Sequence, residues 1–300
     1  NKIILTFVAL FVLFISYLLL PNFYNQTNIT KELKSKLQSK LGLNFKFSQN
    51  ISYNIFPRPH FKTLSPVIFY NESEISKMSE LKIFISLENL FSYKNIKVKD
   101  LVFDNANFNL NLKNYNFFQK LLYKNFEDGN LLIKNSNIFF RDSEQEVLFI
   151  NKILKIKYYY DSNELKNVLY SDNEIFNIPF SMEMFLSNDK QKIFSKIDLN
   201  LIKLKIENEL NHKDGKKIGK SEFIYNKLKR IVEYRIENYS LNFHLYDKND
   251  EPKISYKGNF NFKPFYANIN GNLDKINLNY LFGSNAIIAE LLKTEIFNHK

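Results

Sequence analysis

The chain has 300 residues, no cysteine and a formal net charge of +11. The lack of cysteine excludes disulfide bonds, thiolate zinc sites and a cysteine nucleophile. Apolar residues make up 45% of the sequence and aromatic residues 16%, which is ample for a packed core and argues against disorder. The lysines are spread along the chain and form no nucleic-acid-binding motif. The charge therefore suits a solvated surface or anionic lipid head groups, and we expect no nucleic-acid partner.

The chain begins with an uncharged, strongly apolar run over residues 3–20. As an α-helix this run would be about 27 Å long, close to the hydrocarbon thickness of a bilayer. A cleaved signal peptide has a shorter apolar core and a small-residue cleavage site, whereas the segment from Pro21 to Tyr24 contains no such site. The sequence therefore predicts an uncleaved transmembrane anchor over residues 1–21.

A linker and a short amphipathic helix are predicted for residues 22–42. Apolar residues recur every fourth position from Ile29 to Leu41, which predicts a helix over Asn28–Leu41 that ends at Gly42. This helix could lie on the membrane or cap the following domain. The positive-inside rule would place the lysines of this segment in the cytoplasm, which opposes export of the β domain. Long domains, however, translocate largely regardless of charge.

From residue 43 onward the apolar residues follow a period of two. This alternation is typical of antiparallel strands with one apolar and one solvated face. The phase changes at Leu201 and Ile202, which predicts a β-bulge. The alternating segments begin at Phe45, Leu81, Ala106, Phe176, Tyr239, Ile254 and Phe265.

Turn residues separate these strands. Asp128-Gly129 and Asp214-Gly215 suit tight hairpins, and the segment from Asp247 to Pro252 suits a longer connection. Short helices are predicted for Asn114–Leu122 and Ser284–Phe297. Strands do not alternate with long helices, so a parallel α/β fold is not expected. The predicted fold over residues 43–300 is mainly β, an elongated, twisted antiparallel sheet.

The sequence contains no recognisable catalytic, cofactor or metal site. The four histidines lie far apart, and Asp214 stands where a P-loop ending at Gly219 needs glycine. The acidic cluster around Asp250 lacks the central glycine and terminal glutamate of a calcium loop. We therefore expect a protein that is not an enzyme and has no catalytic residue, cofactor or metal.

The segment Gly42–Phe118 resembles the N-terminal region of the AsmA family of Gram-negative envelope proteins. The order and spacing of its segments match, although Asn114–Phe118 stands where Gly-x-x-Asn-Trp is usual. The chain is also short for the family, so we expect its β domain to be truncated at the C-terminus. The matching segments are, in order, Phe45–Ile55, Phe56–His60, Val67–Asn71, Leu87–Phe91, Ile96–Leu101 and Asn105–Leu112.

The resemblance implies a single-pass inner-membrane protein with most of its chain in the periplasm. It also implies a lengthwise apolar groove that binds or helps to move phospholipid and a role in outer-membrane biogenesis. The expected partners are the phospholipid membrane and other envelope proteins. The alternative is a structural or assembly factor for outer-membrane proteins that has no lipid groove.

We expect one side of each alternating strand to face a single interior. The sequence leaves open whether this interior is an open lipid groove or a closed core. The residues expected to face lipid are Phe45, Phe47, Ile51, Tyr53, Phe108, Leu110, Phe180, Met182, Phe243 and Phe260.

Overall fold

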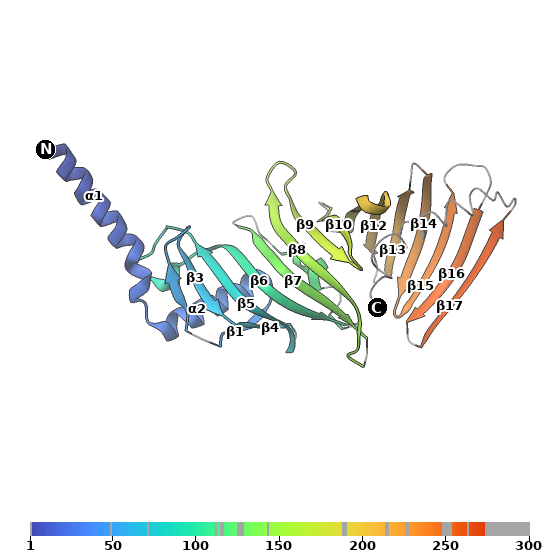
Figure 1. Cartoon of the computed structure of the whole chain (residues 1–300), viewed down its shortest axis with the longest axis horizontal. Coiled ribbons are helices and arrows are strands. Elements are labelled where there is room, and N and C mark those ends of the chain that lie inside the picture. The colour runs from blue at the N-terminus through green and yellow to red at the C-terminus, as the bar shows by residue number, and fades with distance from the viewer. Residues whose placement is uncertain are drawn as a thin grey trace. The chain divides into compact units, whose positions relative to one another are not determined.

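The computed structural model describes residues 2–273, except for residues 49, 71, 112, 115–116, 125–128, 143, 188–190, 214–215, 226–227, 248–253 and 263. Strands account for 59% of the residues, so the fold is mainly β, as predicted, with an N-terminal apolar helix and a few short helices (Figure 1). The chain forms two compact units, Asn1–Tyr160 and Asp161–Lys300. The sequence predicted one β domain over residues 43–300, whereas the contacts divide this region after Tyr160.

The first unit begins with α1 (Lys2–Leu19), which continues into a 3-10 turn, η1 (Leu20–Phe23). Among the described residues, this is the one helix long and apolar enough to cross a membrane, with a mean hydropathy of 2.9. Most of its side chains are exposed, and in Figure 1 it is the dark blue helix at the N-terminal end. The predicted membrane-length helix is confirmed, whereas its membrane and its orientation stay predictions.

The amphipathic helix α2 (Gln26–Leu41) starts two residues earlier than predicted. The Asn25 side chain caps its N-terminus, and Gly42 ends it in the left-handed conformation, with φ of 70°. Its apolar face, which includes Leu33 and Leu37, is fully buried. Lys40 Nζ donates hydrogen bonds to the backbone carbonyls of Val98 and Lys99 at 3.1 and 3.0 Å. The helix therefore caps the domain, which was one of the two predicted placements.

The sheet of the first unit is built around one long strand, β5. β3 and β4 pair in succession with one edge of β5, β2 pairs with β3, and β1 pairs with β4. On the other edge of β5 the order is β6, β7, β8. The strands are β1 (Asn44–Lys46), β2 (Ser52–Asn54), β3 (His60–Leu64), β4 (Val67–Tyr70), β5 (Ser73–Ile85), β6 (Val98–Leu110), β7 (Leu131–Arg141) and β8 (Val147–Asp161).

The predicted single strand over Phe45–Ile55 is wrong, because two short strands, β1 and β2, occupy this segment. Their partners explain the break. β1 pairs with β4 and β2 pairs with β3, and Ser65, with φ of 48°, lies between β3 and β4. An interruption between β3 and β4 is thus matched by an interruption between β1 and β2.

The connection from β6 to β7 also departs from prediction. β7 runs parallel to β6, with Leu101 opposite Leu131, and the connection contains a short helix, α3 (Phe117–Leu121). Gly129 therefore does not join two hairpin strands, and its neighbour Asp128 lies outside the described residues. A parallel pair needs a crossover, and α3 lies within it. The helix predicted over Asn114–Leu122 is confirmed in this shorter form.

Helix α3 covers the buried face of the sheet near β6 and β8. The rings of Phe117 and Phe118 lie with their centroids 6.2 and 5.5 Å from that of Phe108, which is fully buried. Tyr158 Oη donates a hydrogen bond to the carbonyl of Leu121, and burial raises the pKa of this hydroxyl. The two helices α2 and α3 thus close the core of the first unit.

The second unit is an antiparallel meander in which each strand pairs with the next. Strands β12 and β13 pair as far as Lys213 opposite Lys216, although Asp214 and Gly215 between them lie outside the described residues. The strands are β9 (Lys166–Ile175), β10 (Ile178–Leu186), β11 (Lys192–Leu199), β12 (Leu204–Lys213), β13 (Lys216–Tyr225), β14 (Leu228–Glu237), β15 (Ser240–Asp247), β16 (Ile254–Phe262) and β17 (Phe265–Leu273).

The bulge predicted at Leu201 and Ile202 is wrong. A 3-10 turn, η3 (Asn200–Ile202), followed by Lys203 with φ of 54°, reverses the chain between β11 and β12. The change of phase therefore marks a chain reversal between two strands. The longer connection predicted from Asp247 to Pro252 lies mostly outside the described residues, between the antiparallel strands β15 and β16. The helix predicted over Ser284–Phe297 lies entirely outside them.

Replacing Leu33 with alanine should test the packing of α2. Removal of a fully buried leucine side chain should lower the free energy of unfolding of the first unit by about 2–5 kcal/mol, because it leaves a cavity. Urea unfolding of the full-length chain in mild detergent, followed by circular dichroism, measures this change. The exposed Ser35→Ala is the control and should change stability by less than about 0.5 kcal/mol. Equal unfolding midpoints for the two variants would contradict the packing described.

Candidate functional site

The ten residues predicted to face lipid are divided between the two units. Six of them lie in the first unit, where Phe45, Ile51, Phe108 and Leu110 are buried, while Phe47 and Tyr53 are half-buried. The Phe45 ring packs against Phe103, at 6.0 Å between centroids. In the first unit these side chains therefore form a closed core beneath α2 and α3. Phe180, Met182, Phe243 and Phe260 lie in the second unit.

The four candidates of the second unit lie on one face of its sheet. Directly opposed residues of paired strands point to the same face, and the register matches apolar with apolar at several positions, although Phe180 is opposite Asn173 and Phe223 is opposite Arg230. Met182 is opposite Ile197, and Leu241 is opposite Phe260. We call this surface the apolar face; it comprises Phe180, Met182, Met184, Ile193, Ile197, Ile206, Phe223, Val232, Leu241, Phe243, Leu245, Tyr256, Phe260 and Ile269.

Exposure of the apolar face increases along the meander. Met184 and Ile193, on β10 and β11, are buried, whereas Phe243 and Phe260 are half-buried. Ile269, on β17, is 53% exposed. Phe180 and Met182, also on β10, are half-buried. Within the described part of the second unit, the face is thus partly exposed throughout and most open to solvent at β17.

Aromatic rings cover glycines on this face. A Cβ atom added at Gly219 would lie 2.1 Å from the Tyr234 ring, and one at Gly258 would lie 2.6 Å from the Phe243 ring. Each ring belongs to the neighbouring strand and crosses the glycine opposite to it. The Phe243 ring also stacks on that of Phe260, at 5.4 Å between centroids. Glycine lets these rings lie close to the backbone, which makes this part of the apolar face smooth.

A cluster of hydrogen-bonded polar side chains interrupts the apolar face. Asn208 Oδ1 accepts hydrogen bonds from Ser221 Oγ and Tyr234 Oη, both at 2.7 Å, and Asn208 Nδ2 donates one to Ser195 Oγ at 3.4 Å. Burial raises the pKa of Tyr234, although the hydrogen bond with Asn208 opposes this shift. Tyr234 therefore stays neutral at physiological pH and donates to Asn208. These bonds satisfy polar groups that would otherwise be costly on an apolar surface.

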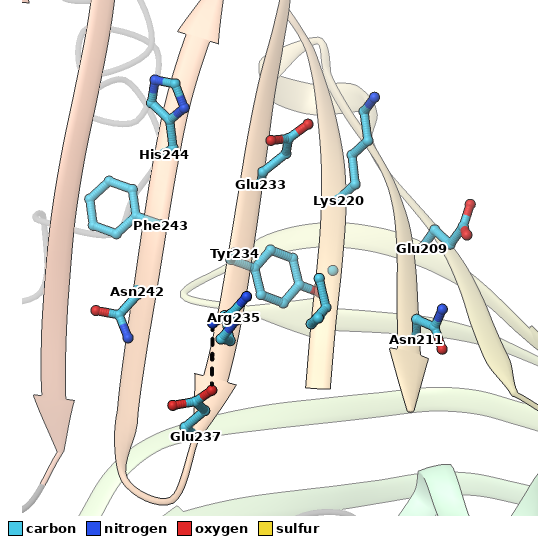
Figure 2. A pocket seen from close by; sticks show the side chains of 12 residues that line it. Glu209, Asn211, Lys220, Glu233, Tyr234, Arg235, Glu237, Asn242, Phe243 and His244 are labelled. Atoms are coloured by element: carbon cyan, nitrogen blue, oxygen red, sulfur yellow. Dashed lines mark ion pairs between the residues drawn. The ribbon is translucent and has the colours of Figure 1, made fainter. Parts of the chain in front are cut away.

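The opposite face of the same sheet is charged and borders a shallow trough of about 640 Å³, whose lining also includes Gly219, Tyr234 and Phe243 from the apolar face. Figure 2 shows Glu209, Lys220, Glu233 and His244 on successive strands from β12 to β15 at directly opposed positions, and the first three of them alternate in charge. The His244 side chain forms a hydrogen bond with a residue of the next strand, β16: its Nε2 lies 3.0 Å from Ser255 Oγ.

Lys220 lies opposite Glu209 on one side and Glu233 on the other, and opposite charges at such cross-strand positions stabilise a solvated sheet surface. Arg235 and Glu237, on the same strand, form an ion pair at 3.8 Å, and both are exposed. Among the described residues, no group of three or more histidine, aspartate or glutamate side chains is placed to hold a metal ion. We therefore assign the trough to the solvated side of the sheet and the candidate site to the apolar face.

Sequence reasoning missed the glycine–aromatic pairs and the Asn208 cluster. From the sequence, Gly219 was considered only as part of a P-loop, although it stands at a position of an alternating strand where an apolar residue is expected. Glycine at such a position is a signal for a ring from the neighbouring strand. Asn208 carried no comparable signal, because its partners Ser195 and Tyr234 lie on other strands.

Comparison with protein-family models gives no match, and no curated protein is significantly similar to the chain. The resemblance to the AsmA family therefore depends on the residues of the segment Gly42–Phe118 alone.

Replacing Gly219 with valine should test the smooth packing of the apolar face. The new side chain would displace the Tyr234 ring, so we expect the free energy of unfolding of the second unit to fall by about 1–3 kcal/mol. Lys220→Val is the matched control, because it places the same side chain at the next position on the charged face. Thermal unfolding followed by circular dichroism compares the two variants. Destabilisation by Lys220→Val as large as that by Gly219→Val would show that the close approach of Tyr234 is not the cause.

Proposed function

We propose that this protein is a membrane-anchored, periplasm-facing β protein of the AsmA family that binds phospholipid acyl chains on its apolar face. In this proposal it helps to move phospholipid and thereby supports outer-membrane biogenesis, without enzymatic activity or a cofactor. The observation that carries the proposal is the partly exposed apolar face in a chain that also has a membrane-length helix. A protein held at a bilayer by α1 meets acyl chains at high local concentration.

The energetics of the apolar face support acyl chains as the ligand. Covering apolar surface stabilises by about 25 cal/mol per Å², or about 0.8 kcal/mol for each CH₂ group. The half-buried rings of Phe243 and Phe260 and the exposed Ile269 leave such surface available. An acyl chain is flexible enough to follow a smooth surface of this kind and brings no polar group that would need a partner there.

The dimensions of the sheet also support acyl chains. The nine strands that the structure describes in the second unit, spaced at about 4.8 Å, give a sheet roughly 40 Å across. An acyl chain in one leaflet extends roughly 15 Å, which is half of the hydrocarbon thickness. The face can therefore hold several chains, and the hydroxyl and amide groups around Asn208 offer one polar contact along it.

A photo-crosslinking residue at Phe243, in the full-length chain in cells, should form lipid adducts detectable by mass spectrometry. The same residue at His244, the next position on the charged face, should form few. Phe108, which is fully buried under α3, is a second control and should also form few. Equal adducts at Phe243 and His244 would rule out lipid binding on the apolar face. Adducts with outer-membrane proteins in place of lipid would favour the assembly-factor alternative.

The proposed topology places residues 22–300 in the periplasm and α1 in the inner membrane. Protease added to spheroplasts should therefore digest the β units while a cytoplasmic marker protein stays intact. The same treatment after lysis is the control for intrinsic susceptibility to the protease. Protection of the β units until the cells are lysed would show that the orientation is the reverse.

A further inference from the structure

Three phenylalanines are the most exposed large apolar side chains among the described residues. Phe23, Phe56 and Phe91 are 84%, 84% and 80% exposed. They belong to three different segments: η1, the connection from β2 to β3, and the connection from β5 to β6. Exposed apolar side chains that gather in one place mark an interaction site, whereas single ones are normal.

Hydrogen bonds bring these segments to the end of α1. Tyr17 Oη donates to the carbonyl of Leu87 at 2.6 Å and accepts from the backbone N–H of Leu90 at 3.1 Å. The Tyr17 ring also lies 5.1 Å from the ring of Phe91, measured between centroids. Tyr24 Oη, just beyond η1, donates to the carbonyl of Leu90. The connection that carries Phe91 is therefore joined to the last turns of α1.

The connection that carries Phe56 is joined to α1 in the same way. Tyr53 Oη, three residues before Phe56, donates to the carbonyl of Leu18 at 2.8 Å. This bond satisfies one of the backbone carbonyls that the end of a helix leaves without an intrahelical partner. Arg58, two residues after Phe56, forms an ion pair with Asp100 at 2.6 Å. Contacts on both sides thus hold Phe56 in place.

The exposure of side chains along α1 shows where on the helix these contacts begin. Phe11 and Phe14 are exposed, as expected for side chains in hydrocarbon, whereas Leu18 is buried against the first unit. The helix thus passes from lipid to protein near Tyr17 and Leu18, which is where the phenylalanine-bearing connections are attached. At that level a protein surface meets the bilayer interface, where aromatic side chains are enriched.

We propose that Phe23, Phe56 and Phe91 form a membrane collar that inserts into the interface of the bilayer crossed by α1. The ligand is the boundary between phospholipid head groups and acyl chains. The collar fixes the first unit against the membrane, because its segments are hydrogen-bonded to α1 and cannot turn independently of it. This inference rests on the membrane anchoring in the proposed function and is independent of lipid binding on the apolar face.

Single tryptophans can test the collar, because the sequence contains no tryptophan. Phe56→Trp, Phe91→Trp and Phe11→Trp, each made in the full-length chain, place one fluorophore in the collar or in α1. The control is Leu148→Trp, at a 62% exposed position on β8, at the opposite edge of the first sheet from β2 and β3. Each variant is reconstituted in vesicles of phosphatidylethanolamine and phosphatidylglycerol, with and without bromine on the acyl chains, and its fluorescence is compared.

Brominated lipid should quench the tryptophans at positions 11, 56 and 91 and leave the one at position 148 unquenched. Quenching at position 11, with positions 56 and 91 no more quenched than position 148, would overturn the collar and leave the anchor standing. Absence of quenching at position 11 would overturn the anchor and the collar together. Lipid crosslinking at Phe243 is a separate measurement, so failure of the collar and failure of lipid binding are distinguishable.

Discussion

Each strand of this protein has an apolar side that must be kept from water, and the two units meet this requirement differently. In the first unit, α2 and α3 supply a second layer, and Leu33, Phe108 and Tyr158 are fully buried between helices and sheet. In the described part of the second unit the only helical element is η3, and the apolar face stays partly exposed. The closed core stabilises the first unit, and the open face is the surface that we propose binds acyl chains.

Tyrosine hydroxyl groups form several of the hydrogen bonds that connect elements at these apolar surfaces. Its ring packs as an apolar group while its hydroxyl donates to a fixed acceptor, so one side chain both fills space and sets position. Tyr158 joins β8 to α3, Tyr53 joins β2 to α1, and Tyr234 joins β14 to Asn208 on β12. Each bond connects elements that are distant in sequence, and together they order surfaces that apolar contact alone would leave free to slide.

The proposed functions use the two units in complementary ways. In these proposals, the membrane collar and α1 hold the first unit against the bilayer, with Tyr17 and Tyr53 joining the collar to the helix. The apolar face of the second unit then offers a surface on which acyl chains can leave water. Its charged face carries cross-strand pairs such as Lys220 and Glu233, which keep the sheet soluble on that side. A sheet with two such different faces can present lipid on one side while it stays hydrated on the other.

Local periodicity determined what the sequence alone could predict: the apolar helix, the amphipathic helix that ends at Gly42, and the mainly β fold. These features depend on neighbours within a few residues, where the periods of 3.6 and 2 are set by backbone geometry. The pairing of strands decided the rest. The division of Phe45–Ile55 into β1 and β2, the parallel pairing of β6 with β7, and the ring of Tyr234 over Gly219 depend on partners far along the chain. The alternation placed Phe108 and Phe243 alike on the apolar side of their strands, yet Phe108 is buried in a closed core and Phe243 is half-buried on an open face. A strand is covered by a second layer only where segments distant in sequence pack against it. The residues of the strand itself therefore do not show whether it is covered.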